Sequence, residues 1–458
     1  MKTSIIIGII SLILVSLFIG CGGDSTVQVI TTPTTTTVTA TPTGTTATAT
    51  PTTTTTTGSD GVYTQNGGTV SQKGKSYRST ADDISAVTID SSGTFTLTDS
   101  TITKSGNTSS ADNSSFYGLN AGVLVKGASK MTLSNSKVTT TGTGANGIFA
   151  YGSDSEINVS DTTVICTAQL GHAVMASGGG KLTVSNVNMT TEGANSGAIA
   201  TDRGGGTISV TGGNVTTSGA DAPGIYSTGT ITVSGATISA TGSEGAVIEG
   251  ANSIILTDTS LSSSKTNKWG VLIYQSMSGD AEGTQGTFTM TGGSLAHTAE
   301  DGPLFYVTNS TGIITLKGVN VTASSGIIIK ASTGNWGTSG SNGGKVNFTA
   351  DSQSLTGNLL ADSSSTITAV LQNGSALNGY INSANSASAI NLTMDSSSTW
   401  NVTADSYLTC LTDTGGISGT TITNITGNGY TVYYSSSGCP ELGGQTYTLN
   451  GGGSLVPR

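Results

Sequence analysis

A five-residue pattern of alternating apolar and polar positions recurs along most of the chain. Each copy holds an apolar residue, a polar one, a second apolar one, usually Ser or Thr, and then Asn, Asp or Gly. The copies begin at Phe95, Met131, Ile157, Leu182, Ile208, Ile231, Ile254, Phe288 and Ile314. Strict alternation is typical of a half-buried strand. The pattern therefore predicts repeated strands whose first and third positions face a core.

The fifth position of each copy predicts a sharp bend. It holds only Asp, Asn or Gly, the residue types that best tolerate a left-handed backbone. These residues are Asp99, Asn135, Asp161, Asn186, Gly212, Gly235, Asp258, Gly292 and Gly318. After the bend, a second short strand places one apolar residue between two polar ones, as in residues 188–190 and 214–216. Each repeat thus contains at least two strands joined by a corner.

A third strand opens with Gly and is apolar at nearly every position. Its copies start at Gly122, Gly147, Gly171, Gly197, Gly224, Gly245, Gly270, Gly302 and Gly326. Three strands per turn of about 25 residues are what a right-handed parallel β-helix requires, with coils ~4.8 Å apart. We therefore predict an all-β fold, a single right-handed parallel β-helix of roughly sixteen coils. Its main repeats span residues 61–345, and looser coils with a Tyr-rich cap span residues 346–458.

The first sixty residues follow a different pattern. Lys2 precedes an apolar run from Ile5 to Ile19, which is typical of an export signal. The ending at residues 18–21 resembles the lipobox of prokaryotic lipoproteins, in which a Cys becomes the lipidated N-terminus. We therefore expect residues 1–20 to be a signal peptide and Cys21 to anchor an exported chain at the cell surface. An uncleaved signal anchor is the alternative, because the run approaches the ~17 residues of a short spanning helix.

Residues 21–60 are rich in Thr and interrupted by Pro, with almost no charge and few large apolar side chains. A segment of this composition buries too little surface to fold, so it predicts a disordered stalk. At ~3.1 Å per residue, such a stalk holds the rest of the chain up to roughly 100 Å from a membrane. This geometry suits a protein whose folded part is displayed away from the cell surface.

The composition limits the classes of molecule that the chain is expected to bind. The 458 residues carry 16 Lys and Arg against 26 Asp and Glu, a net charge of −10, and only 9% of residues are charged. Nucleic acids, anionic lipids and anionic polysaccharides are bound through clustered Lys and Arg, so a chain of this charge disfavours all three. The chain has no C-x-x-C pair and no calcium nonapeptide repeat, and we expect no metal or cofactor.

The four cysteines divide into separate roles. If Cys21 carries lipid, three thiols remain, and Cys410 and Cys439 lie in the same C-terminal section. A disulfide between these two would contribute roughly 3 to 4 kcal/mol through loop entropy. Cys166 is then expected to be a buried free thiol.

The repeats resemble the pectin-lyase-like β-helix superfamily. Within it, their low charge and high Ser, Thr, Asn and Gly content are similar to adhesin-like surface proteins of anaerobic bacteria and methanogenic archaea. The likeness covers residues 61–458 and is one of repeat form and composition. It implies the fold, and it suggests a surface protein that attaches to glycans, cells or neighbouring copies.

A catalytic interpretation has little local support. Pectin-degrading members of the superfamily use clustered Asp with Arg, Lys or His in one groove. Here His172 and His297 are the only histidines, and they fall on different strands. The adjacent acidic pairs are residues 82–83 and 300–301, which we expect in solvated turns. A polysaccharide lyase or glycoside hydrolase on the same scaffold remains the alternative to an adhesin without catalysis.

Two sets of residues are candidates for modification or binding. Among the Asn-x-Ser/Thr sequons, four lie on outward strand positions, where a glycan could be accommodated. They are Asn158, Asn188, Asn214 and Asn320. Aromatic residues recur on one face of the third strand. They are Phe149, Tyr151, Tyr226, Tyr274 and Tyr306.

Two orientations of the aromatic set are open. If it faces outward, it forms a ladder that stacks on sugar rings. If it faces inward, it is an aromatic stack within the core. The third strand is apolar at nearly every position, so its alternation does not distinguish the two, and we favour the inward stack.

Overall fold

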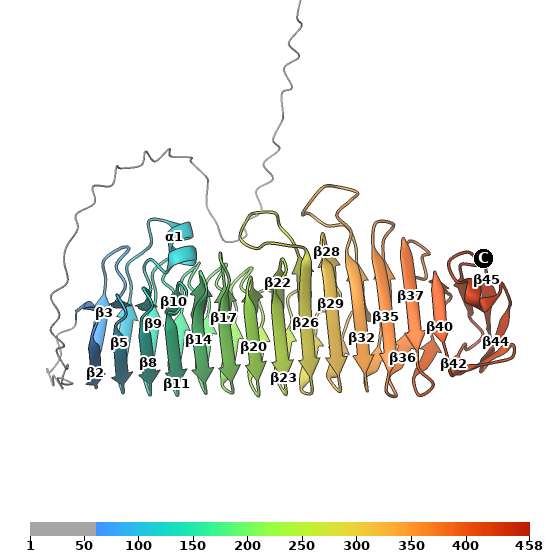
Figure 1. Cartoon of the computed structure of the whole chain (residues 1–458), viewed down its shortest axis with the longest axis horizontal. Helices are drawn as coiled ribbons and strands as arrows, with labels where there is room; N and C mark the ends of the chain where they lie inside the picture. Colours follow the sequence, from blue (N-terminus) through green and yellow to red (C-terminus); the bar gives the residue numbers. More distant parts are fainter. Residues whose placement is uncertain (1–60) are drawn as a thin grey trace, which may run out of the picture.

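The computed structural model describes residues 61–458, which form a parallel β-solenoid of stacked coils (Figure 1). The predicted signal peptide, the predicted lipidation site Cys21 and the predicted stalk lie outside the described residues. Every coil contributes strands to parallel sheets that run along the stack. Val159 pairs with Val184, and Val184 pairs with Val210, so one coil advances by about 25 residues as predicted.

The third strand of each repeat forms a 12-stranded sheet. Its strands are, in order, β1 (Tyr63–Asn66), β4 (Val87–Asp90), β7 (Val123–Val125), β10 (Ile148–Tyr151), β13 (Val174–Ser177), β16 (Ile199–Thr201), β19 (Ile225–Ser227), β22 (Ala246–Glu249), β25 (Val271–Tyr274), β28 (Phe305–Thr308), β31 (Ile327–Ala331) and β34 (Asn358–Ala361).

The first strand of each repeat forms a 14-stranded sheet. Its strands are β2 (Thr69–Lys73), β5 (Thr94–Thr98), β8 (Lys130–Ser134), β11 (Glu156–Ser160), β14 (Gly180–Ser185), β17 (Gly206–Thr211), β20 (Thr230–Ser234), β23 (Ser253–Thr257), β26 (Gln285–Thr291), β29 (Thr311–Lys317), β32 (Lys345–Asp351), β35 (Thr366–Gln372), β37 (Ala389–Met394) and β40 (Cys410–Asp413).

The second strand of each repeat forms a 10-stranded sheet. Its strands are β3 (Ser76–Ser79), β6 (Thr101–Lys104), β9 (Lys137–Thr140), β12 (Thr163–Cys166), β15 (Asn188–Thr191), β18 (Asn214–Thr217), β21 (Thr237–Ala240), β24 (Ser260–Ser263), β27 (Ser294–His297) and β30 (Asn320–Ala323).

A nine-stranded sheet belongs to the C-terminal coils. It contains β33 (Ser354–Thr356), β36 (Ala376–Gly379), β38 (Thr399–Val402), β39 (Ser406–Leu408), β41 (Ile417–Ser418), β42 (Thr421–Thr426), β43 (Thr431–Tyr434), β44 (Tyr447–Asn450) and β45 (Ser454–Pro457). Its β41–β42 and β44–β45 pairs are antiparallel, unlike the other strand pairs of the described chain. Regular coiling therefore gives way to a different arrangement near the C-terminus.

The core is built as the alternation predicts. Leu133, Val159 and Val184 are buried and stack from coil to coil, whereas Asn158 and Thr183 between them are exposed. All nine predicted bend residues adopt a positive φ, from 47° at Asp258 to 65° at Gly212 and Gly292. The periodic corners, read from residue type alone, are thus confirmed.

Three coils are longer than their neighbours, and their extra residues leave the stack. Thr94 pairs with Lys130, and Ser253 pairs with Thr287, so these coils advance by 36 and 34 residues. The first holds the helix α1 (Ala111–Tyr117), and the second holds the loop 275–284. A third long coil holds the loop 332–344. Figure 1 shows α1 and both loops rising on the same side of the stack.

The helix α1 has defined ends. Ser110 accepts a hydrogen bond from the amide of Asn113 at the N-cap, and Gly118 ends the helix with a φ of 72°. Its Phe116 side chain is buried. No helix within residues 61–458 has the length and apolar character needed to cross a bilayer.

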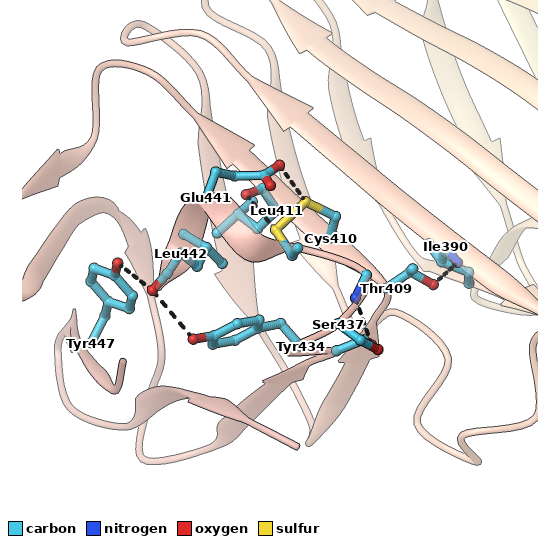
Figure 2. The surroundings of a disulfide bond; sticks show 12 residues. Ile390, Thr409, Cys410, Leu411, Tyr434, Ser437, Glu441, Leu442 and Tyr447 are labelled. Atoms are coloured by element: carbon cyan, nitrogen blue, oxygen red, sulfur yellow. Dashed lines mark hydrogen bonds between the residues drawn. A yellow bond between two sulfur atoms is a disulfide. The ribbon is translucent and has the colours of Figure 1, made fainter. Parts of the chain in front are cut away.

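The C-terminal end is closed by a disulfide and a short 3₁₀ helix. Cys410 on β40 is bonded to Cys439, which directly precedes η1 (Pro440–Leu442). Figure 2 shows the disulfide at Cys410 beside Glu441 and Leu442. The hydroxyls of Tyr434 and Tyr447 both donate to the carbonyl oxygen of Leu442. The thiol of Cys166 is buried in the core, and burial raises its pKa to about 12.

Candidate functional site: the aromatic face

The outward side chains of the 12-stranded sheet form two register columns, which together we call the aromatic face. One column contains Leu124, Phe149, Met175, Ala200, Tyr226, Val247, Leu272, Tyr306 and Lys330. The other pairs Tyr151 with Ser177 in β10 and β13, and Glu249 with Tyr274 in β22 and β25. All five predicted aromatic residues lie in these columns.

The favoured expectation of an inward aromatic stack is wrong. The apolar residues of these columns form two clusters separate from the main core, to which Val123 and Val125 of the same strand belong. Strand side chains alternate between the two faces of a sheet, so Leu124 must point away from the side that Val123 fills. The aromatic residues therefore lie on the outer side of the coil.

The outward rings are nevertheless well covered. Phe149 is fully buried, and Tyr274 and Tyr306 are each 7% exposed, whereas Tyr151 and Tyr226 are half-buried. The cover comes from residues of the extra segments and corners. The rings therefore do not form a fully exposed ladder, because the extra residues of the long coils fold back over the aromatic face.

Further aromatic rings complete the face. Trp269, from the corner before β25, stacks on Tyr306 with 4.4 Å between ring centroids. Trp336, from the loop 332–344, lies 4.5 Å from the ring of Tyr274. Both tryptophans are half-buried and contribute accessible ring surface. Tyr226 packs against both apolar clusters, so the rings form one continuous row along the stack.

At the other end of the row, the residue after Phe116 supplies an exposed ring. Tyr117, the last residue of α1, is 47% exposed and contacts Tyr151 edge to face at 5.4 Å. The hydroxyl of Ser177 donates to the carbonyl oxygen of Phe116 at 2.6 Å, which fixes α1 to the strand below it. Accessible rings therefore occur from α1 to the loop 332–344.

A buried carboxylate holds the central tyrosines in place. Glu249, only 1% exposed, accepts hydrogen bonds from the hydroxyls of Tyr226 at 2.5 Å and Tyr274 at 2.7 Å. The hydroxyl of Ser276 also donates to Glu249, which ties the loop 275–284 to the face. Burial and the nearby Tyr274 and Glu249 raise the pKa of Tyr226 well above its usual range. Glu249 is therefore a positioning residue for the rings.

A second carboxylate, Asp202, directly follows β16, two coils before Glu249. Asp202 is buried, and burial together with the carboxylate of Asp280 raises its pKa well above the usual range. Arg203 lies 3.9 Å above the ring of Phe116 and donates to Asp280 at 2.7 Å. Because Phe116 belongs to α1 and Asp280 to the loop 275–284, Arg203 connects the two covering segments.

Sequence reasoning missed several of these residues. Trp269, Trp336, Tyr117 and Asp280 lie outside the repeat, so periodicity assigned them no position. A signal was nonetheless present, because three coils exceed the usual length by about ten residues. Extra residues in a solenoid collect at corners, and here they cover the aromatic face.

The predicted modification sites lie elsewhere. Asn158, Asn188, Asn214 and Asn320 are all exposed on the outer sides of the 14-stranded and 10-stranded sheets. The amide of Asn214 donates to the side-chain oxygen of Asn188 at 3.0 Å. The sulfur atoms of Cys410 and Cys439 lie within 4.8 Å of a carboxylate oxygen of Glu441, but the two sulfurs are bonded to each other.

Both histidines are buried, and the acidic pair at residues 82–83 lies in an exposed turn. His172 is buried, and burial lowers its pKa to about 4. His297 contacts the hydroxyl of Ser263 at 2.8 Å, but both side chains are buried inside the solenoid. In an exposed turn, Asp83 accepts a hydrogen bond from the amide of Ser109. Hydrogen bonding to Ser109 lowers the pKa of Asp83.

No family model, curated protein or solved structure matched this chain in the comparisons.

Proposed function

We propose that this chain is an exported cell-surface protein that attaches to neutral glycans through the aromatic face. The observation that carries the proposal is the row of half-buried rings, Trp269, Trp336, Tyr226 and Tyr151, held beside buried carboxylates on the outer side of one sheet. Sugars are bound in proteins by aromatic rings that stack on their apolar faces, with polar groups nearby to accept hydroxyl hydrogens.

The rigidity of the face supports recognition without large rearrangement. The Trp269 and Tyr306 rings stack, and the hydroxyl of Tyr306 donates to the carbonyl oxygen of Thr333 at 3.2 Å. Preorganised rings lose little conformational entropy on binding. The carboxylates of Glu249 and Asp280 and the net charge of −10 oppose anionic polysaccharides, so a neutral glycan is the partner that fits.

The remaining parts of the proposal concern location. A lipid on Cys21 and an extended stalk over residues 21–60 would place the rod outside the cell, with its aromatic face free to contact another surface. Glycosylation at Asn158 or Asn320 would leave this face clear, because both residues lie on other sheets.

The proposal is tested by binding the full chain to an array of neutral and acidic glycans. We expect saturable binding to a neutral class, weakened at least tenfold by the double substitution Trp269→Ala and Trp336→Ala, because each exposed ring contributes about 1 kcal/mol. Tyr430→Ala is the matched control, since Tyr430 is 40% exposed in the C-terminal region. Undiminished affinity in the double variant would contradict the proposal.

A hydrolase is the second candidate, favoured by one observation. Asp202 and Glu249 lie two coils apart, ~10 Å along the stack, and the pKa of Asp202 is raised. Glycoside hydrolases use a pair of carboxyl groups, of which the general acid has a raised pKa. Against it, Glu249 is already bonded to Tyr226 and Tyr274.

The two candidates differ in turnover. Attachment predicts that the glycans bound on the array stay intact, whereas hydrolysis releases reducing ends. Release by the wild-type chain that disappears in Asp202→Asn would establish the enzyme. Binding without release would support attachment.

A further inference from the structure

A core column that is apolar through the body of the solenoid ends in an acidic residue. In the 14-stranded sheet, twelve successive coils place apolar side chains in one inward column. They are Leu97, Leu133, Val159, Val184, Val210, Val233, Leu256, Met290, Leu316, Ala350, Leu371 and Met394. The next member, paired with Met394, is Asp413. A carboxylate thus caps the column at the C-terminal end.

Only one oxygen of this carboxylate has partners. Oδ1 of Asp413 accepts from the amide of Gly416 at 2.8 Å and from the side-chain amide of Asn424 at 3.3 Å. Oδ2 is buried and has no hydrogen-bond partner, although Asp413 is only 4% exposed. Among residues 61–458, no Lys, Arg or His forms an ion pair with it. A buried charge left in this state costs several kcal/mol.

A second buried oxygen without a partner faces the same point. Oδ1 of Asn424 lies 1.9 Å, and Oδ2 of Asp413 2.4 Å, from the position that a Cβ on Gly416 would occupy. The two oxygens can therefore be no farther apart than these two distances together. Glycine is needed at residue 416, because any side chain there would collide with both oxygens.

The orientation of Asn424 is fixed by its other contacts. Its amide nitrogen donates to Asp413 Oδ1, to the carbonyl oxygen of Ser398 at 3.2 Å and to that of Asp395 at 3.5 Å. Rotating the amide by half a turn would set its oxygen against three acceptors. The amide oxygen must therefore face the free oxygen of Asp413, and two acceptors confront each other without a donor.

We infer that Asp413 and Asn424 bind a calcium ion that closes the C-terminal end of this column. Carboxylate and amide oxygens are ligands that Ca²⁺ prefers, at about 2.3 to 2.6 Å. Two oxygens this close can share one ion, which supplies the missing positive charge. The turn over residues 414–419 is largely exposed, so local opening admits the ion and the water that completes its shell.

The inference is independent of glycan attachment, because Asp413 lies on β40 and Asn424 on β42, away from the aromatic face. Trp400 provides a local probe, since it is buried and pairs with Ile425, the neighbour of Asn424. Trp269 and Trp336, the other two tryptophans, report on the aromatic face.

The test is calcium titration of the full chain after removal of divalent ions with a chelator, followed by calorimetry and thermal unfolding. We expect one saturable site per chain and a calcium-dependent rise in the unfolding temperature. Asp413→Asn keeps the shape and removes the charge, so it should weaken binding at least tenfold and abolish the rise. Asp154→Asn removes an exposed carboxylate and should change neither.

Two results would overturn the inference. One is equal calcium affinity in the wild type and Asp413→Asn. The other is a wild-type unfolding temperature that does not change when calcium is added.

Discussion

The outward faces of the 14-stranded and 12-stranded sheets share one coil geometry and differ in nearly everything else. On the 14-stranded sheet, the outward positions hold short polar residues such as Thr132, Asn158 and Thr183, which are exposed. On the 12-stranded sheet, they hold rings and carboxylates, and most of these are covered. Because the backbone repeats, the side chains and the coil lengths decide how the two faces differ.

The difference arises from three departures from the repeat. Each long coil sends its extra residues over the 12-stranded sheet, and none covers the outward Thr and Asn rows. A solenoid tolerates such insertions, because a coil closes its hydrogen bonds with its neighbours whatever the corner length. The covered face gains rigid ring contacts, while the bare face stays solvated.

Removing the carboxylate that organises the covered face should have the largest effect. We expect Glu249→Ala to lower the free energy of unfolding by about 2 to 4 kcal/mol, because it leaves a cavity and removes the carboxylate that accepts from the hydroxyls of Tyr226 and Tyr274. Guanidinium denaturation followed by the fluorescence of Trp269 and Trp336 measures it. Glu249→Gln, which keeps the volume, should lose less. If Glu249→Ala lowered the free energy of unfolding by less than about 0.5 kcal/mol, the covered face would contribute no more to stability than the exposed face of the 14-stranded sheet.

The next effect is a dependence on pH. Burial raises the pKa of Asp202 in the folded state above its ordinary value of 3.8. At a pH between the unfolded and the folded pKa, the folded chain therefore holds a proton that the unfolded chain releases. Its contribution to stability is therefore complete below the unfolded pKa and falls as pH rises, by at most ~1.4 kcal/mol per pH unit. Asp202→Asn cannot ionise, so the variant does not lose this contribution to stability as the pH rises. Unfolding temperatures measured upward from pH ~4 should diverge in favour of the variant. Parallel curves would contradict the prediction.

A smaller effect concerns the tip of the loop 275–284. Met277 is 63% exposed and has a φ of 66°, which costs a non-glycine residue free energy. We expect Met277→Gly to raise the free energy of unfolding by about 1 kcal/mol and to weaken glycan binding. Ala128→Gly relieves a φ of 58° away from the covering loops and should stabilise without changing binding. Equal binding in both variants would show that the tip makes no contact.

The smallest effect belongs to the bare face. Thr183→Ala should change the free energy of unfolding by less than ~0.5 kcal/mol, because this exposed side chain packs against little. It should also leave glycan binding unchanged. A stability loss comparable to that of Glu249→Ala would show that the Thr rows support the coil, and it would reverse the comparison.

Much of the fold could be predicted because its determinants are local. The alternation around Val159 and the bend at Asp161 each depend on a few adjacent residues, and both were predicted correctly. The five aromatic residues were also assigned correctly to one face of the third strand. Their direction was not, because Val123 and Leu124 are equally apolar, and alternation cannot distinguish two buried faces.

The sequence by itself determined the repeating coil, its corners and the residues that share each face, because period, residue type and backbone preference act over short distances. Only the tertiary structure decided that the third strand turns its rings outward and that the segments holding Tyr117, Asp280 and Trp336 fold back over them. Those contacts join residues far apart in the chain. They depend on burying apolar surface and pairing buried charges, which no local pattern specifies.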